Sequence, residues 1–148
     1  MPLVGRALPI SDFRLSLPSW RTSGTIIAHV THSVLVVDDD PAFRKLARRL
    51  LAASGLTVVG ESAGVRAALA DAMHLRPAAC LVDVELPDGD GVTLARVLSA
   101  LPWHPRVVLT SINAEIVAND EVSGSGAEAF VAKSELPNAP LSELLRGE

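Results

Sequence analysis

Short apolar runs recur along the chain from Ser33 onward, and each run is followed by polar turn residues and then by a longer amphipathic segment. The runs are rich in valine, leucine and alanine. Continuous apolar runs of about five residues are typical of strands that are buried on both faces. The pattern predicts five strands, at residues 33–37, 56–60, 79–83, 106–110 and 128–132.

The segments between these runs carry apolar residues at helical spacing. The clearest predicted helix covers residues 41–54, with Asp40 as its N-cap, Pro41 at its first position and Gly55 as its stop. Further helices are predicted to begin near residue 62, to cover 92–100, to lie weakly within 114–123 and to cover 141–146. The residues expected on the buried faces of the first two helices are Phe43, Leu46, Ala47, Leu50, Leu51, Val65, Ala68, Leu69, Ala72 and Met73.

Strands that alternate with helices indicate the α/β class. Such a chain forms a doubly wound, five-stranded parallel sheet with helices on both faces, joined by right-handed crossovers. A chain of this length is sufficient for one hydrophobic core, so we predict one domain over residues 33–148.

Residues 1–32 follow a different pattern. They contain Pro2, Pro9 and Pro18 among serine, threonine and glycine, and no helical or strand period lasts. We predict a flexible N-terminal arm. A second hypothesis is that this segment is absent from the natural protein, because Val30 lies just before the first strand and a valine codon can serve as a start.

Charge and cysteine content narrow the functional classes. The formal net charge is −4, although the first 33 residues hold three arginines and one aspartate, so the remainder is more acidic. This balance argues against nucleic-acid binding by the globular part. The one cysteine, Cys80, excludes an internal disulfide and fits a reducing, cytoplasmic compartment. No apolar stretch is long enough to span a membrane.

Polar residues stand at the carboxyl ends of the predicted strands. Asp38 and Asp39 follow the first strand, Asp83 ends the third, Thr110 ends the fourth and Lys133 follows the fifth. Each of these residues alone is an ordinary cap, turn or surface residue. Because parallel strands bring their carboxyl ends to one edge, where open α/β sheets bind ligands, we expect these side chains to converge.

Neighbouring carboxylates repel one another unless a cation offsets them. We therefore expect Asp39 and Asp83 to hold a divalent cation, and Mg²⁺ suits a site with few carboxylates and a phosphate group. A carboxylate can also accept a phosphoryl group. In such a reaction Lys133 would offset the charge of one phosphoryl oxygen, and Thr110 would donate a hydrogen bond to another.

Four segments, at residues 34–41, 81–91, 108–111 and 129–133, resemble the receiver domain of two-component response regulators. The resemblance implies the flavodoxin-like strand order 2-1-3-4-5 and a switch in signal transduction that is not a turnover enzyme. It also implies site roles. Asp83 is the phosphoacceptor, Asp39 binds the metal directly, Asp38 acts mostly through water and the carbonyl of Glu85 is a third ligand. Thr110 and Phe130 form a conformational switch pair.

Three departures from the family pattern bear on these implications. Ser134 follows the lysine where a proline is common, and Glu85 places a charge beside the acceptor that would alter the phosphate lifetime. Pro137 and Pro140 leave only a short final helix on the face that commonly pairs receivers, so a homodimer stays an open alternative.

The sequence favours a stand-alone receiver that takes a phosphoryl group from a histidine kinase or a phosphotransfer protein. A truncated DNA-binding regulator is the first alternative. The second is a haloacid-dehalogenase-type phosphohydrolase, in which Asp38 would be the nucleophile and Asp40 the general acid. A basic helix face made of Arg44, Arg48 and Arg49 is expected to be solvated, on the helix where kinases commonly dock in this family.

Overall fold

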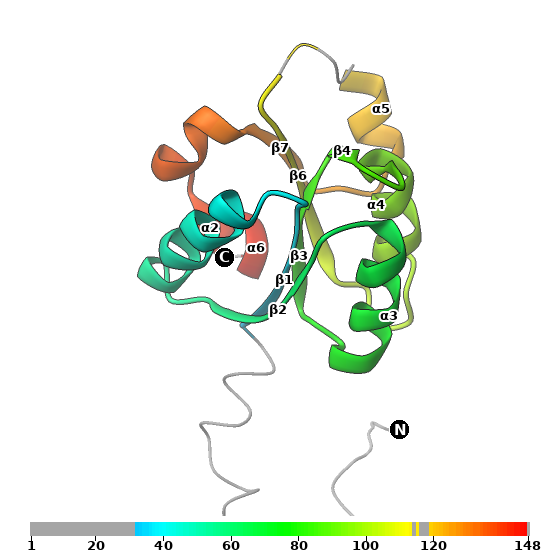
Figure 1. Ribbon diagram of the computed structural model, residues 1–148, viewed down its shortest axis with the longest axis horizontal. Coiled ribbons are helices and arrows are strands. Elements are labelled where there is room, and N and C mark those ends of the chain that lie inside the picture. Colours follow the sequence, from blue (N-terminus) through cyan, green and yellow to red (C-terminus); the bar gives the residue numbers. More distant parts are fainter. Residues whose placement is uncertain (1–31, 114, 116–118, 148) are drawn as a thin grey trace, which may run out of the picture.

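The structure is a computed structural model, and it describes residues 32–113, 115 and 119–147. Its centre is a five-stranded, all-parallel sheet with the order β2-β1-β3-β6-β7, as the resemblance predicted (Figure 1). The strands are β1 (Ser33–Val37), β2 (Thr57–Ser62), β3 (Ala79–Asp83), β6 (Arg106–Ser111) and β7 (Ala129–Ala132).

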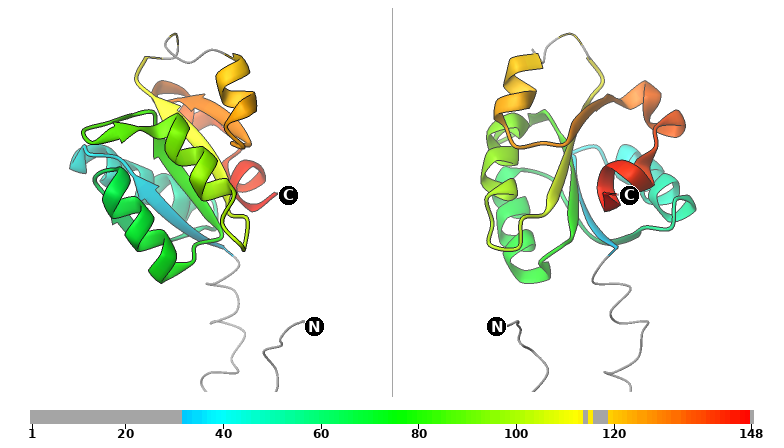
Figure 2. Two further views of the ribbon diagram at one scale, coloured as in Figure 1. Left: turned by 90° about the vertical axis from the view of Figure 1, so that its right-hand side faces the viewer. Right: turned by 180° about the vertical axis from the view of Figure 1, so that it is seen from behind.

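Helices cover both faces of this sheet, so the α/β class is also confirmed. Figures 1 and 2 show helices on either side of the sheet. The first face carries α2 (Pro41–Ala53) and α6 (Leu141–Arg146), and the second carries α3 (Val65–Leu75), α4 (Gly91–Ser99) and α5 (Asn119–Gly124). Alternating strand residues point to opposite faces, which divides the core into two layers.

The central strands are apolar over most of their length because both of their faces are covered. Every residue of β1 is buried. Leu35 and Val37 pack with α3 and α4, whereas Val34 and Val36 pack with α2 and α6. The polar residues that follow the strands therefore stand at the edge of a fully enclosed core.

Helix α2 begins as the sequence predicts. The Asp40 side chain accepts a hydrogen bond from the Ala42 N–H at 3.0 Å, and Pro41 occupies the first turn. Gly55, at φ +83°, follows the C-cap residue Ser54 in the left-handed conformation that glycine adopts without strain. The sequence signals at both ends of this helix were therefore sufficient to place it.

The second helix was placed too early by the sequence. Strand β2 runs to Ser62, and α3 starts only at Val65. Its first N–H groups are capped by a distant residue, since Asp88 accepts hydrogen bonds from Val65 N–H at 2.6 Å and from Arg66 N–H at 3.1 Å. A cap that lies 23 residues away in sequence leaves no local pattern to read.

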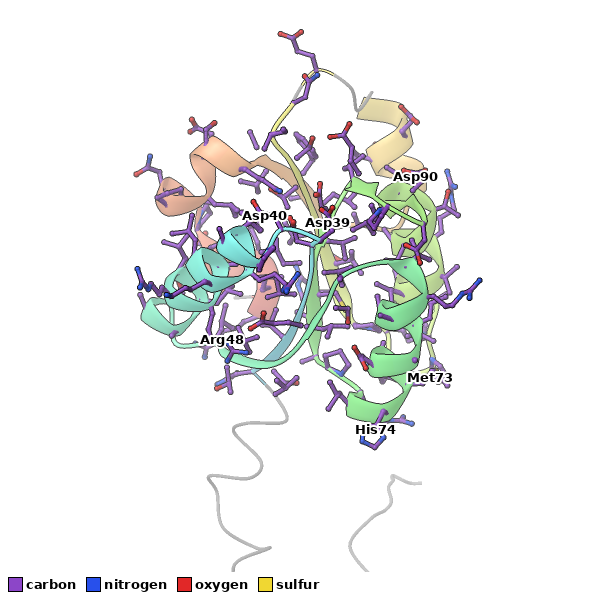
Figure 3. All side chains as sticks on the ribbon, viewed as in Figure 1. Asp39, Asp40, Arg48, Met73, His74 and Asp90 are labelled. Carbon is purple, nitrogen blue, oxygen red and sulfur yellow. The ribbon has the colours of Figure 1, made fainter. Side chains whose placement is uncertain are left out.

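Two apolar residues that were expected in the core face outward. Met73, which Figure 3 labels on α3, is 58% exposed, and Leu46 is 43% exposed on α2. Both lie at helical spacing with core residues, but the strip of each helix that contacts the sheet is narrower than the apolar strip. Spacing alone therefore overstated the buried face.

Three short elements of the described chain were not predicted. The loop after β3 forms a small antiparallel pair, β4 (Glu85–Leu86) and β5 (Gly89–Asp90). After β7 the chain enters a 3₁₀ helix, η3 (Lys133–Asn138), which contains Pro137. The weak helix expected within 114–123 is observed as α5, and the final helix has the predicted bounds.

Apart from His32, the predicted N-terminal arm lies outside the described residues. Among the helices of the described part of the chain, none has the length and hydropathy needed to cross a bilayer.

The core position of Cys80 leads to a test of the fold. Cys80 is fully buried in β3, and burial raises its pKa from 9.0 to about 12. The thiolate is the reactive form, so at a given pH near 8 its population falls about a thousandfold. We expect the native protein to resist iodoacetamide and the urea-unfolded protein to gain one alkyl group in its intact mass. Rapid alkylation of the native protein would contradict this packing.

Candidate functional site

The polar strand ends meet at one edge of the sheet, as predicted. Strand pairing aligns Asp83 of β3 with Thr110 of β6, and β1 lies on the other side of β3. Figure 3 shows Asp39 and Asp40 at the carboxyl end of β1, where α2 begins. The adjacent strand ends therefore deliver an acid pair, a further acid and a hydroxyl to one place.

Three carboxylates form the centre of this site. Asp38, Asp39 and Asp83 each offer an oxygen, and these oxygens all lie within 4.8 Å of one another. Asp38 is fully buried and Asp83 is only 5% exposed, whereas Asp39 faces solvent. The cluster is thus open on the Asp39 side and closed toward the core.

Lys133 neutralises the buried side of this acid cluster. Its Nζ lies 2.7 Å from Asp38 Oδ2 and 3.4 Å from Asp83 Oδ2, and it stacks 4.2 Å from the centre of the Phe43 ring. Burial acts to lower the pKa of Lys133, but the contacts with Asp38 and Asp83 outweigh it, so its pKa lies above the ordinary value. The lysine therefore stays charged between the two buried carboxylates.

Main-chain donors fix both buried acids. Asp38 Oδ1 accepts a hydrogen bond from the Asp40 N–H at 2.8 Å, and Asp83 Oδ1 accepts one from the Glu85 N–H at 3.1 Å. Burial raises the pKa of Asp83 to about 6. The Glu85 N–H and Lys133 lower it, and the charge of Asp38 raises it further. Burial therefore disfavours the charged form of Asp83.

The donor set fits a hard divalent cation. Carboxylate and carbonyl oxygens are the ligands that Mg²⁺ takes up in proteins, usually with several waters, and the exposed side of the cluster leaves room for water. The hydrogen bond to Asp83 also brings the main chain of Glu85 to the site. Asp38, Asp39 and Asp83 would hold the ion, and the role expected of the Glu85 carbonyl stays a prediction.

Thr110 supplies an uncommon feature. Its hydroxyl is completely buried, and within the described part of the chain Oγ1 has no hydrogen-bond partner. Phe130, the other member of the expected switch pair, is half-buried in β7 and packs with the core layer under α3 and α4. A buried hydroxyl without a partner is unfavourable, which makes Thr110 available to a new acceptor at this edge.

Two expectations about neighbouring residues need revision. Asp40 caps α2 and is not one of the three clustered acids, which gives no support to the hydrolase interpretation in which it acts on substrate. The basic face is exposed at Arg48 and Arg49 as expected, whereas Arg44 is only partly exposed, and Arg44 and Arg48 also form ion pairs with Glu61 at 3.0 and 2.7 Å. Glu61 lies far away in sequence, so helical spacing could not reveal these pairs.

Comparisons with known proteins agree with this geometry. A family model described as "Response regulator receiver domain" matches residues 34–144. A protein-glutamate methylesterase/protein-glutamine glutaminase from Nocardioides sp. is 37% identical over 103 residues, which is 68% of this chain and 28% of that protein. The DNA-binding transcriptional activator DevR/DosR from Mycobacterium tuberculosis is also 37% identical, over 68% of this chain and 46% of its own length.

Solved structures extend the comparison. A signal receiver domain from Mycobacterium tuberculosis has a TM-score of 0.65 at 32% identity and covers 74% of this chain and 93% of its own. The chemotaxis response regulator CheY4 of Vibrio cholerae has a TM-score of 0.66 at 23% identity, covering 77% of this chain and 96% of its own. At that identity the second likeness shows the fold alone.

The raised pKa of Asp83 predicts how the site affects stability. Its folded pKa of about 6 lies above the unfolded value of 3.8, so its contribution to folding is complete below about pH 4 and is lost as the pH rises through 6. Asp83→Asn should therefore raise the free energy of unfolding of the metal-free protein by about 1–2 kcal/mol at about pH 7.5, with little effect near pH 4.

Urea unfolding in the presence of a chelator measures this effect at both pH values. Glu135→Gln is the control, because it removes the same charge at an exposed position. A less stable Asp83→Asn protein at the higher pH would show that Lys133 fully compensates the acid.

Proposed function

The chain belongs to the family of response regulator receiver domains, and we propose that it accepts a phosphoryl group on Asp83 in a Mg²⁺-dependent reaction and signals by a change of conformation. Phosphorylation on aspartate and the use of Mg²⁺ are general properties of this family in two-component systems. The receiver itself is a signalling switch.

The observation that carries the proposal is the arrangement around Asp83. One carboxylate, buried and raised in pKa, has an ammonium at 3.4 Å and two further acids within 4.8 Å. On the adjacent strand β6 it faces a hydroxyl that has no hydrogen-bond partner among the described residues. Stability alone does not favour a buried carboxylate whose charge is poorly compensated. Such a site is suited to a carboxylate that gains a covalent anionic group and to ligands that stabilise it.

The phosphoryl transfer follows from these residues. An oxygen of ionised Asp83 attacks the phosphorus of a phosphohistidine, an O–P bond forms, and the P–N bond breaks with its electron pair leaving on the imidazole. Lys133 stays protonated and offsets charge on a phosphoryl oxygen. Mg²⁺, when held by Asp38, Asp39 and Asp83, supplies further positive charge to the phosphoryl oxygens.

The proposed change of conformation would begin at the hydroxyl of Thr110. A phosphoryl oxygen on Asp83 would be an acceptor for its unpartnered hydroxyl, since the two residues are paired across β3 and β6. Movement of Thr110 toward that oxygen would leave space near the end of β7. The half-buried ring of Phe130 would then turn inward, and the population would shift toward this second conformation.

The donor would be a histidine kinase or a phosphotransfer protein. Beside Lys133 the surface has a hollow bordered by the start of α2 and the ends of β6 and β7. Leu46 and Ile112, which line it, are 43% and 79% exposed. Apolar side chains next to a charged acceptor site are suited to a protein partner that brings its phosphohistidine to Asp83.

We propose a stand-alone receiver as the simplest form, with a regulator that also carries a DNA-binding domain as the alternative. Among the curated relatives, one is named a methylesterase and one a DNA-binding activator, and the chain spans 28% and 46% of their lengths. The coding sequence on either side of this chain, together with the mass of the natural protein, would distinguish the two forms.

The phosphoacceptor assignment is tested with acetyl phosphate. With Mg²⁺ the wild type should gain one phosphoryl mass, and Asp83→Asn should gain none because the amide is not a nucleophile. Asp90→Asn is the matched control, because Asp90 lies on the same loop and caps α4, a role that asparagine also fills. Equal labelling of wild type and Asp83→Asn would overturn the assignment.

The same protein samples test the hydrolase alternative. Sustained release of product from an aryl phosphate, abolished by Asp38→Asn but kept by Asp83→Asn, would favour that enzyme class over a receiver. A receiver should instead show at most one labelled site on each molecule.

Thr110 leads to a separate prediction. Thr110→Val removes a buried hydroxyl without a partner, so the unphosphorylated protein should lose no stability and gain up to about 1 kcal/mol. Labelling of Asp83 should persist, while the accompanying NMR shifts in β7 disappear. Ser111→Ala is the control, since that hydroxyl accepts a hydrogen bond from the Asn113 N–H at 3.0 Å. Unchanged β7 shifts in Thr110→Val would argue against a switch through this residue.

A further inference from the structure

An arginine of α2 reaches back to the loop that carries the acid pair. Arg44 Nη1 donates a hydrogen bond of 2.7 Å to the main-chain carbonyl of Asp38, and its Nε donates one of 3.0 Å to Glu61 Oε1. We propose that Arg44 is a positioning residue that fixes the peptide between Asp38 and Asp39 and thereby sets the geometry of the Mg²⁺ site. This inference rests on the proposed function.

The peptide in question decides where Asp39 points. The Asp38 N–H donates to the Ser62 carbonyl at 2.9 Å, and the Asp40 N–H donates to Asp38 Oδ1 at 2.8 Å. These bonds hold the loop before and after Asp39, whereas the Asp39 side chain is exposed. Rotation of the peptide between Asp38 and Asp39 would move the Asp39 carboxylate away from Asp83, and the hydrogen bond from Arg44 opposes that rotation.

Glu61 holds the guanidinium of Arg44 in place. It stands near the end of β2, beside β1, and pairs with Val36 in the register of the sheet. Its carboxylate holds Nε of Arg44, so that the other branch of the guanidinium is directed at the Asp38 carbonyl. The planar, forked guanidinium can serve both acceptors at once, and a lysine ammonium at the end of a flexible chain does not reproduce this geometry.

The molecule contains a matched control for this role. Arg48, one turn further along α2, binds the same carboxylate through Nε at 3.0 Å and Nη2 at 2.7 Å. Figure 3 shows it near β2, away from Asp39. Its contact with main chain is a long one, 3.5 Å to the Val58 carbonyl. Arg44→Met and Arg48→Met thus each remove one charge and one partner of Glu61, but only the first releases Asp38.

A purely electrostatic role and a positioning role of Arg44 predict opposite changes in Mg²⁺ affinity for Arg44→Met. Removal of a cation near three carboxylates would strengthen Mg²⁺ binding if only electrostatics acted. Loss of a residue that orients the ligands weakens metal binding, commonly by 10- to 100-fold. The sign of the change therefore separates the two explanations.

The experiment compares wild type, Arg44→Met, Arg44→Lys and Arg48→Met by calorimetric titration with Mg²⁺. We expect about tenfold weaker binding for Arg44→Met, a similar loss for Arg44→Lys despite its retained charge, and a change within about twofold for Arg48→Met. In the metal-free proteins the NMR signals of the Asp39 and Asp40 amides should shift in both Arg44 variants and stay in place in Arg48→Met.

Other outcomes would overturn the inference. Equal affinities for Arg44→Met and Arg48→Met, tighter binding by Arg44→Met, or wild-type affinity in Arg44→Lys would each do so. If the wild type binds Mg²⁺ and is labelled by acetyl phosphate, such a result leaves the proposed function intact. If the wild type neither binds Mg²⁺ nor is labelled, the proposed function fails and the positioning role fails with it.

Discussion

The site depends on one electrostatic constraint, namely that two buried carboxylates share a single ammonium. Asp38 is fully buried, Asp83 is nearly so, and Lys133 contacts both at 2.7 and 3.4 Å. Without the lysine these charges would be uncompensated in the interior, at a cost of several kcal/mol. Because β6 lies between β7 and β3, the lysine must reach across the end of β6, and the small residue Thr110 stands at that strand end.

The loops that supply the acids are each tied to a neighbouring element by a hydrogen-bonding charged side chain. Arg44, itself directed by Glu61, holds the carbonyl of Asp38, while Asp88 on the acceptor loop binds the first N–H groups of α3. A charged group donates or accepts in every one of these contacts, and such hydrogen bonds are stronger than neutral ones. The carboxylate geometry is therefore fixed by β2, α2 and α3 as well as by the strands that carry the acids.

The sequence was most informative where a structural cause is local. The five strands, the start of α2 at Asp40 and the convergence of Asp38, Asp83 and Lys133 follow from apolar runs, a capping residue and the parallel arrangement, whereas the strand order was implied by the family resemblance. It failed where the cause is remote. The late start of α3 depends on Asp88, and the ion pairs on the basic face of α2 depend on Glu61. The local period of apolar residues reveals neither contact.

The groups at this edge differ in burial, pKa and hydrogen bonding, and these differences support the roles proposed for them. Asp38 and Asp40 accept hydrogen bonds from main-chain N–H groups, and Asp38 is also paired with Lys133. Asp39 is exposed, Thr110 has no partner within the described residues, and Asp83 has a pKa raised to about 6. A fold selected for stability alone would not leave a buried hydroxyl without a partner beside a buried carboxylate of raised pKa. A phosphoryl group on Asp83 would give Thr110 an acceptor, and a cation beside it would offset the charge of the carboxylates, so the phosphorylated state would remove both mismatches.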